Sequence, residues 1–161
     1  MTTDNPADRL RTVMAQVPAA VSIVTAQLGD LPHATTVSAF MSLSMEPPMM
    51  LVSLDNRSSL LPQIDHGSRI GINVLNDRQA DVAARCAVRN KDIDDLTSSW
   101  KLDDDRPPRI PDCIAWVDFT VTMFVPAGDH TLVIGTVNEA ETTPGAPLVY
   151  WQRTYGTHSA A

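Results

Sequence analysis

The spacing at which apolar residues recur changes several times along this chain, and each change predicts the start of a new helix or strand. The first apolar positions recur at helical spacing between Asn5-Pro6, which can cap and start a helix, and Pro18, which ends it. An amphipathic helix is therefore predicted at the start, with its apolar stripe on Leu10, Val13, Met14 and Val17.

Most of the remaining apolar runs are β-rich and short. Strands are predicted at 20–27, 32–40, 49–54, 69–75, 114–125 and 131–137, with a further apolar run at 148–151. The first two form a hairpin around the turn signal Gly29-Asp30. Several strands follow one another without a helical crossover, so a mainly antiparallel barrel fits better than a parallel α/β sheet.

Helices are predicted at two further places. A short helix capped by serine is expected at 58–65, and a longer one at 77–88. The stretch 89–112 is rich in aspartate and contains three prolines, so it is expected to be a polar excursion with little regular structure. No internal repeat or second domain is visible, and residues 1–161 are expected to form one domain with peripheral helices.

Composition narrows the class of protein. The chain has 161 residues, 43% of them hydrophobic, and a net charge of −7 without a basic cluster, which argues against nucleic-acid binding. No apolar segment follows a basic start and no run approaches the roughly 20 residues of a membrane span, so a cytoplasmic protein is expected.

Common catalytic signatures are missing from the sequence. There is no GxGxxG, GxxxxGK[ST] or GxSxG motif, and the four histidines form no metal-binding pair, so no metal site is expected. Cys86 and Cys113 lack ligand spacing and are predicted to be reduced structural thiols, with a disulfide or a reactive thiol as the alternatives. Backbone amides and hydroxyls on a β scaffold would have to hold any cofactor.

A segment rich in hydroxyl groups runs from Thr35 to Ser44. If one strand continues through it, alternation places four hydroxyls on one face, those of Thr36, Ser38, Ser42 and Ser44. An exposed strand of ordinary composition would look the same. The functional alternative is a wall for a flat heteroaromatic ring such as a flavin, whose acceptors and single ring donor match hydroxyls and main-chain amides.

Two further segments carry candidate chemistry. The first, directly after a predicted strand, is Asp55-Asn56-Arg57-Ser58-Ser59. Its serines would begin a helix, and the free N–H groups of that helix, together with Arg57, would favour a phosphate. A plain helix cap is the alternative. Gly128-Asp129-His130 forms a tight turn that places His130 at the start of a strand. His130 is either structural or a hydrogen-bond donor to the nicotinamide amide or to a flavin edge.

In order and spacing, these segments resemble the flavin reductase family with the FMN-binding split-barrel fold. Further matching segments are Val21-Ser22-Ile23-Val24-Thr25-Ala26, Gly71-Ile72-Asn73-Val74-Leu75 and Pro147-Leu148-Val149-Tyr150. The resemblance covers about residues 10–155. It is nearest to short reductases that supply reduced flavin to two-component monooxygenases.

The resemblance implies a six-stranded Greek-key antiparallel split barrel that works as a homodimer, with FMN or FAD near the subunit interface and NADH or NADPH as co-substrate. It implies that His130 helps to place the nicotinamide and that Ser42 lies near the reactive edge of the ring. Tyr155 is a weaker candidate for the nicotinamide region. The implied flavin-binding residues are Thr36, Val37, Ser38, Ala39, Ser42 and Ser53 around the ring, and Asn56, Arg57, Ser58 and Ser59 at the phosphate.

The predicted function is therefore an NAD(P)H:flavin oxidoreductase with a separate monooxygenase as its partner. Two alternatives stay open: an enzyme that acts directly on an organic metabolite with bound flavin, and a flavin-binding protein without catalysis. The first is motivated by His33-Ala34-Thr35, where the family often has Gly-Met or Gly-Phe, and by the acidic excursion. Arg85, Arg89 and Arg153 are each candidates to contact the 2′-phosphate of NADPH, and none is diagnostic.

Overall fold

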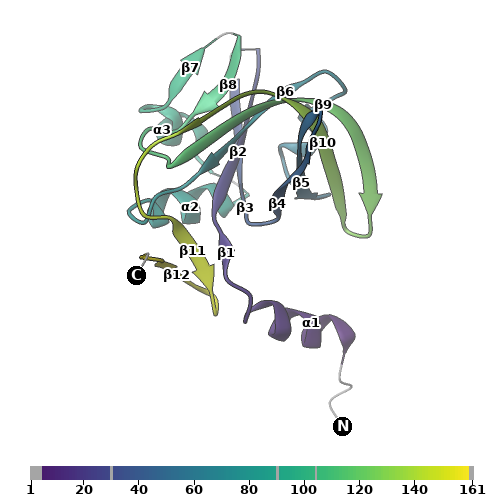
Figure 1. Cartoon of the computed structure of the whole chain (residues 1–161), viewed down its shortest axis with the longest axis vertical. Helices are drawn as coiled ribbons and strands as arrows, with labels where there is room; N and C mark the ends of the chain where they lie inside the picture. The colour runs from purple at the N-terminus through teal and green to yellow at the C-terminus, as the bar shows by residue number, and fades with distance from the viewer. Residues whose placement is uncertain (1–4, 30, 90, 104, 160–161) are drawn as a thin grey trace.

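The computed structural model describes residues 5–29, 31–89, 91–103 and 105–159. A twisted antiparallel sheet forms the body of the protein, with strand order β3-β2-β6-β9-β10-β5-β4 (Figure 1). Its strands are β2 (Ser22–Leu28), β3 (Leu31–Val37), β4 (Phe40–Met45), β5 (Pro48–Asp55), β6 (Arg69–Val74), β9 (Ala115–Ala127) and β10 (His130–Thr142). The predicted mainly β, antiparallel fold and the hairpin of β2 and β3 are confirmed.

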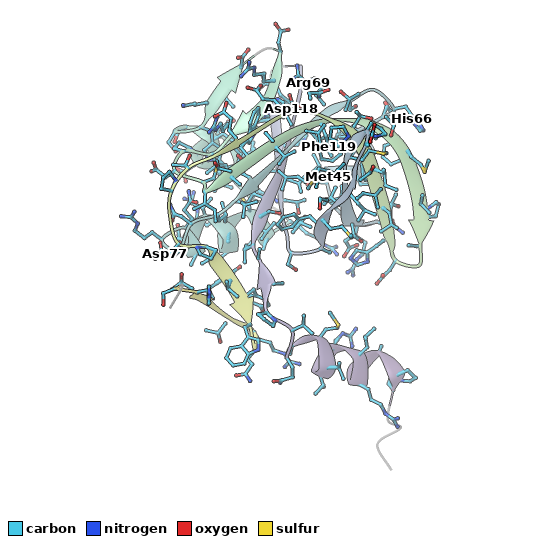
Figure 2. The ribbon with its side chains drawn as sticks, viewed as in Figure 1. Met45, His66, Arg69, Asp77, Asp118 and Phe119 are labelled. Carbon is cyan, nitrogen blue, oxygen red and sulfur yellow. The ribbon has the colours of Figure 1, made fainter. Side chains whose placement is uncertain are left out.

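One face of this sheet encloses the larger hydrophobic core. On β5 the side chains alternate strictly, so that Met50, Val52 and Leu54 are buried while their neighbours are half-buried. Phe119 and Ile70, from β9 and β6, are fully buried in the same cluster. The fully buried Asp118 is paired with Arg69 at the outer end of these strands (Figure 2). The Arg69 Nε donates to Asp118 Oδ1 over 3.2 Å.

The predicted strand 32–40 does not continue into the serines that follow. β3 ends at Val37, β4 begins at Phe40, and the two lie at opposite edges of the main sheet. The Ser53 N–H donates to the Ala39 carbonyl over 2.9 Å, which fixes the bend to β5. The main sheet consequently has seven strands rather than six, and the single four-hydroxyl face predicted from alternation was wrong.

The stretch 89–112 is more ordered than predicted. It contains α3 (Ile93–Thr97) and the hairpin of β7 (Lys101–Asp103) and β8 (Arg106–Arg109). A second apolar cluster forms where this segment packs against α2 (Ala80–Ala87), and it buries Leu96, Trp100 and Ile110. Buried Asn73 accepts from the Ile110 N–H over 2.8 Å, so the segment is tied to the sheet. Half-buried Ile93 packs on the same cluster, and Ile93, Leu96 and Trp100 follow helical spacing, a short pattern that the surrounding aspartates and prolines obscured.

The predicted serine-capped helix at 58–65 was also wrong. Only one 3₁₀ turn forms there, η1 (Leu61–Gln63), and no side chain caps it. Pro62 and the deep burial of Leu60 and Ile64 hold this segment in an irregular path. Ser58 and Ser59 therefore belong to a loop and do not present a helix N-terminus.

The N-terminal helix and the end of the chain form a separate extension. α1 (Pro6–Met14) is capped by Asn5 as predicted and projects away from the main sheet (Figure 1). Next to it lies a small sheet of β1 (Ala19–Ala20), β11 (Leu148–Trp151) and β12 (Thr154–Thr157), of which β12 was not predicted. The Gln152 N–H donates to the Ala15 carbonyl over 2.9 Å, and Trp151 Nε1 donates to the Gln16 carbonyl over 3.1 Å, so the hairpin tip holds the helix.

Within the described ranges, no helix has the length and apolar character needed to cross a bilayer. In the same part of the chain, no three His, Cys, Asp or Glu side chains gather in a way that would hold a metal ion. Both cysteines are buried and unpaired, which confirms the prediction of structural thiols.

Candidate functional site

The ends of β3 and β5 and the start of β10 surround a pocket of about 200 Å³. Sheet register creates it, because Asp55 at the end of β5 pairs with His130 at the start of β10. The last residues of β3 and the bend to β4 supply the other wall. Its lining residues are Thr35, Thr36, Val37, Ser38, Ala39, Ser53, Leu54, Asp55, Ser58 and His130.

A second pocket of about 200 Å³ adjoins the first and is richer in positive charge. The two share Thr35, Thr36, Asp55 and Ser58 in their walls. The second pocket adds three cationic side chains and one further hydroxyl, those of Arg57, Arg89, Lys91 and Ser59. One continuous site thus has two ends: a hydroxyl-rich end, called the uncharged end here because the Asp55 carboxylate that lines it is paired with Arg57, and a cationic end.

Arg57 is held in a fixed orientation by Asp55. Its Nε donates to Asp55 Oδ1 over 3.0 Å, and a terminal nitrogen donates to Oδ2 over 2.7 Å. These bonds hold the pKa of Asp55 well below its usual range, so Asp55 is ionised at neutral pH. Asp55 also offsets much of the charge of Arg57, and an anion here would depend on Arg89 and Lys91 as well.

Lys91 is half-buried beside α2, and its Nζ donates to the Cys86 carbonyl over 2.8 Å. Burial lowers the pKa of Lys91. Among the residues the structure describes, neither Lys91 nor Arg89 is paired with a carboxylate. Two cations without carboxylate partners at one end of a pocket favour a negatively charged ligand.

His130 reaches the uncharged end with one ring nitrogen already occupied. Its Nδ1 lies 2.7 Å from Asp129 Oδ1, and this contact lowers the pKa of Asp129. When Nδ1 carries the proton and donates to the carboxylate, Nε2 is left as an acceptor. Asp129 therefore sets the orientation and tautomer of a ring that lines the pocket.

Asn56 has a supporting position. Its Nδ2 donates to the Gly128 carbonyl over 3.3 Å, and its Oδ1 accepts from the Thr131 hydroxyl over 2.8 Å. These bonds tie the end of β5 to the β9–β10 turn and so place His130 relative to β5. Asn56 lines neither pocket.

A larger apolar cavity of about 770 Å³ opens on the other side of the bend between β3 and β4. It shares Ser38 and Ala39 with the uncharged end of the site and is walled by α1 and the β11–β12 hairpin, including Tyr150 and Trp151. A second molecule could therefore meet a ring held at Ser38 and Ala39.

A family model described as the flavin reductase like domain matches residues 14–159. The chain belongs to this flavin reductase-like family. It is 36% identical over 155 residues, 94% of this chain and 86% of the relative, to the actinorhodin polyketide dimerase of Streptomyces coelicolor. It is 31% identical over 149 residues, 92% of this chain and 94% of the relative, to the reductase component of 4-hydroxyphenylacetate 3-monooxygenase from Thermus thermophilus.

Solved structures agree with the family assignment. The crystal structure of BorF, the flavin reductase component of a bacterial two-component tryptophan halogenase, superposes with a TM-score of 0.87 at 26% identity, covering 96% of this chain and 99% of that one. The predicted membership of the flavin reductase family is confirmed.

The structure brings most of the predicted flavin-binding residues of this chain together. Thr36, Val37, Ser38, Ala39, Ser53 and Ser58 line the uncharged end, and Arg57, Ser58 and Ser59 line the cationic end. Ser42 lies on β4, exposed and outside both linings, so its predicted place at the ring edge stays a prediction.

Sequence reasoning placed Thr35 and Asp55 in its candidate segments without a binding role. It missed Leu54 and Lys91 as lining residues and considered Arg89 only for NADPH. Lys91 gave no usable signal, because it lies in the segment that was expected to lack regular structure. Because that segment packs against α2, Lys91 lies at the site, where its Nζ is bonded to the Cys86 carbonyl.

Proposed function

We propose that this protein is an NAD(P)H:flavin oxidoreductase that supplies reduced FMN or FAD to a separate monooxygenase. The observation that carries the proposal is the continuous site, uncharged at one end and cationic at the other, in a chain of the flavin reductase-like family. The reductase component from Thermus thermophilus supports the role of a partner oxygenase.

The residues present fit a phosphorylated flavin. The hydroxyls of Thr35, Ser38 and Ser53 offer both donors and acceptors at the uncharged end without adding charge. The Thr36 hydroxyl donates to the Ala83 carbonyl over 2.6 Å, which anchors β3 to α2 and leaves its oxygen lone pairs available. A phosphate would be held at the cationic end by Arg57, Arg89 and Lys91, with hydroxyls from Ser58 and Ser59.

When bound, a flavin supplies a ring that accepts a hydride. The protein contributes position: Ser38 and Ala39 separate the uncharged end from the larger cavity, so a nicotinamide entering from that cavity would stack against the ring. His130 Nε2, oriented through Asp129, accepts a hydrogen bond from the carboxamide of the nicotinamide. No strong acid or base is required of the chain.

A homodimer completes this proposal. Met41, Leu51, Ile134 and Met123 are aligned across β4, β5, β10 and β9 on the face opposite the core. Met41 is 54% exposed and Met123 is 49% exposed, and the adjacent row contains Ser53 of the pocket. A second copy packed on this row would cover apolar surface and form the missing wall of the flavin site.

Because β3 and β4 are consecutive strands at the two sheet edges, we also expect the sheet to form a split barrel.

Anaerobic reduction of free flavin tests the proposed activity. The pure protein, mixed with excess FMN or FAD and with NADH or NADPH, should bleach the flavin absorbance catalytically. His130→Ala should raise the KM for the nicotinamide nucleotide while the flavin Kd stays close to that of the native protein. Absence of bleaching with all four pairs of cofactors would refute the reductase function.

A second function is favoured by one comparison. A relative at 36% identity is named a polyketide dimerase, and the large apolar cavity beside Ser38 has room for an aromatic molecule. In this alternative, the protein keeps its flavin and acts on an organic metabolite. Retention of flavin through gel filtration, with little reduction of free flavin, would favour it over the reductase.

A further inference from the structure

Asn56 differs from the three residues that follow it in the loop after β5. Arg57, Ser58 and Ser59 line the cationic end of the site, whereas Asn56 lines neither pocket. The family resemblance places all four at the phosphate. The hydrogen bonds of Asn56 lead instead to the β9–β10 turn, which carries His130, and they point to a different role.

Three hydrogen bonds join Asn56 to this turn. Its backbone N–H donates to the Asp129 carbonyl over 2.9 Å, and its Nδ2 donates to the Gly128 carbonyl over 3.3 Å. The Thr131 hydroxyl donates to Asn56 Oδ1 over 2.8 Å. A carbonyl can only accept, so the amide nitrogen must face Gly128, which leaves the amide oxygen for the Thr131 hydroxyl. Both ends of the amide are therefore engaged, in one orientation.

The bond between His130 and Asp129 cannot position the imidazole over the pocket by itself. It joins neighbouring residues, so it fixes the ring relative to the turn but not relative to β5. Asp55 and His130 form the terminal residue pair between β5 and β10, and the turn lies beyond that pair. Asn56 continues the attachment past the end of the two strands.

The position of the turn relative to β5 matters because both contribute to the same pocket. Ser53 comes from β5, His130 comes from β10, and Ser38 and Ala39 lie at the bend that is bonded to Ser53. Movement of the turn would shift the His130 ring relative to any ligand held by the other three residues. Hydride transfer depends on the placement of its reactants, and a displacement of about 1 Å is costly to it.

We propose that Asn56 is a positioning residue that acts through His130, with Thr131 as its partner. By attaching the turn to the end of β5, it holds His130 Nε2 where the carboxamide of the nicotinamide would meet it. Flavin binding itself requires neither side chain. This inference rests on the proposed function, because it requires His130 to contact the nicotinamide.

Steady-state kinetics of substituted proteins, with flavin titrations beside them, test the inference. Asn56→Ala and Thr131→Val should each raise the KM for the nicotinamide nucleotide about fivefold, the equivalent of one lost hydrogen bond, at an unchanged flavin Kd. Thr131→Ser keeps the hydroxyl and should retain the native KM. The bonds of Asn56 are exposed to solvent, so these variants should fold and unfold much as the native protein does.

Combination with His130→Ala separates positioning from a general structural role. If Asn56 acts through His130, adding Asn56→Ala to His130→Ala should raise the KM no further, because the contact is already lost. Asn76→Ala is the matched control. The Asn76 side chain also bonds two backbone groups, the Asp112 carbonyl and the Arg78 N–H, each over 2.8 Å, and it lines neither pocket of the site nor the larger cavity. Its loss should lower stability without changing the KM.

The outcomes separate this inference from the function on which it rests. A native protein that reduces no flavin would remove the proposed function, and the inference with it. Additive effects of Asn56→Ala and His130→Ala on the KM would overturn only the inference, as would an unchanged KM in Thr131→Val. If Asn56→Ala raises the flavin Kd and leaves the KM unchanged, Asn56 belongs to the phosphate site, and the inference is wrong.

Discussion

Cys86 and Cys113 show how burial controls the chemistry of single residues in this protein. The two thiols are 0% and 2% exposed, and burial raises the pKa of Cys86 to about 11. Neither side chain lines the site, although the Cys86 carbonyl holds Lys91. At the residue scale, the backbone carbonyl of Cys86 positions Lys91 at the site, while burial protects the Cys86 thiol from reagents.

We predict that the native protein does not react with a thiol reagent at pH 8, and that two thiols react after denaturation. Stability should also fall as pH rises from 9 to 11. In this window the unfolded chain releases the Cys86 proton, because the ordinary pKa of a cysteine thiol is 9.0, while the folded chain keeps it. The loss is on the order of 2 kcal/mol.

Urea denaturation across this pH range measures the effect, with Cys86→Ala as the comparison. The variant should lose stability less steeply above pH 9, whatever its packing cost at neutral pH. Equal slopes for the two proteins, or rapid labelling of the native protein, would contradict the burial argument.

At the scale of elements, the β9–β10 hairpin is the longest unit, and a glycine fixes its close packing. A register shift lies between Ile134 and Gly135. A Cβ at Gly135 would collide with the Thr120 carbonyl oxygen and the Phe119 ring, so only glycine fits. This hairpin carries His130 at its turn, and its register places His130 opposite Asp55.

Gly135→Ala is expected to destabilise the protein by about 2 kcal/mol or more, because backbone of the neighbouring strand must move. Gly156→Ala is the matched control, since a Cβ there meets no atom within 4 Å. Thermal unfolding of both variants measures the difference. Similar midpoints for the two would show that the hairpin accommodates a side chain at Gly135.

The elements themselves were largely predictable, whereas their arrangement was not. The apolar run at 49–54 and the proline before β2 are local signals, so those strands followed from the sequence. The break after Val37 is not local: Ser38 and Ala39 resemble strand residues and bend because Ala39 bonds to Ser53. The pairing of Asp55 with His130 depends on register across β5 and β10, which no single segment encodes.

The whole molecule presents apolar surface that one chain leaves uncovered. The row from Met41 to Met123 lies on the outer face of the sheet and crosses β5, the strand that supplies Ser53 to the proposed flavin pocket. A pocket of about 200 Å³ with an open side is consistent with a site that a second copy completes. Dimerisation and flavin binding should therefore be linked.

Met123→Glu is expected to convert a dimer into a monomer and to weaken flavin binding, because a carboxylate would be buried in the apolar contact. Leu102→Glu on β7 is the control, since Leu102 is 48% exposed and lies away from this row. Light scattering on a sizing column reports the mass. A native protein that is monomeric and binds flavin at full affinity would refute this link.

The central claim is that a flavin ring lies against Ser38 and Ala39. Ser38 is exposed at the bend between β3 and β4, so Ser38→Trp should fold normally while filling the pocket. A fluorescence titration with FMN should show binding to the native protein and to the control Ser99→Trp, and affinity at least about tenfold weaker for Ser38→Trp. Unchanged affinity in a correctly folded Ser38→Trp protein would contradict the account, because the ring would have to bind elsewhere.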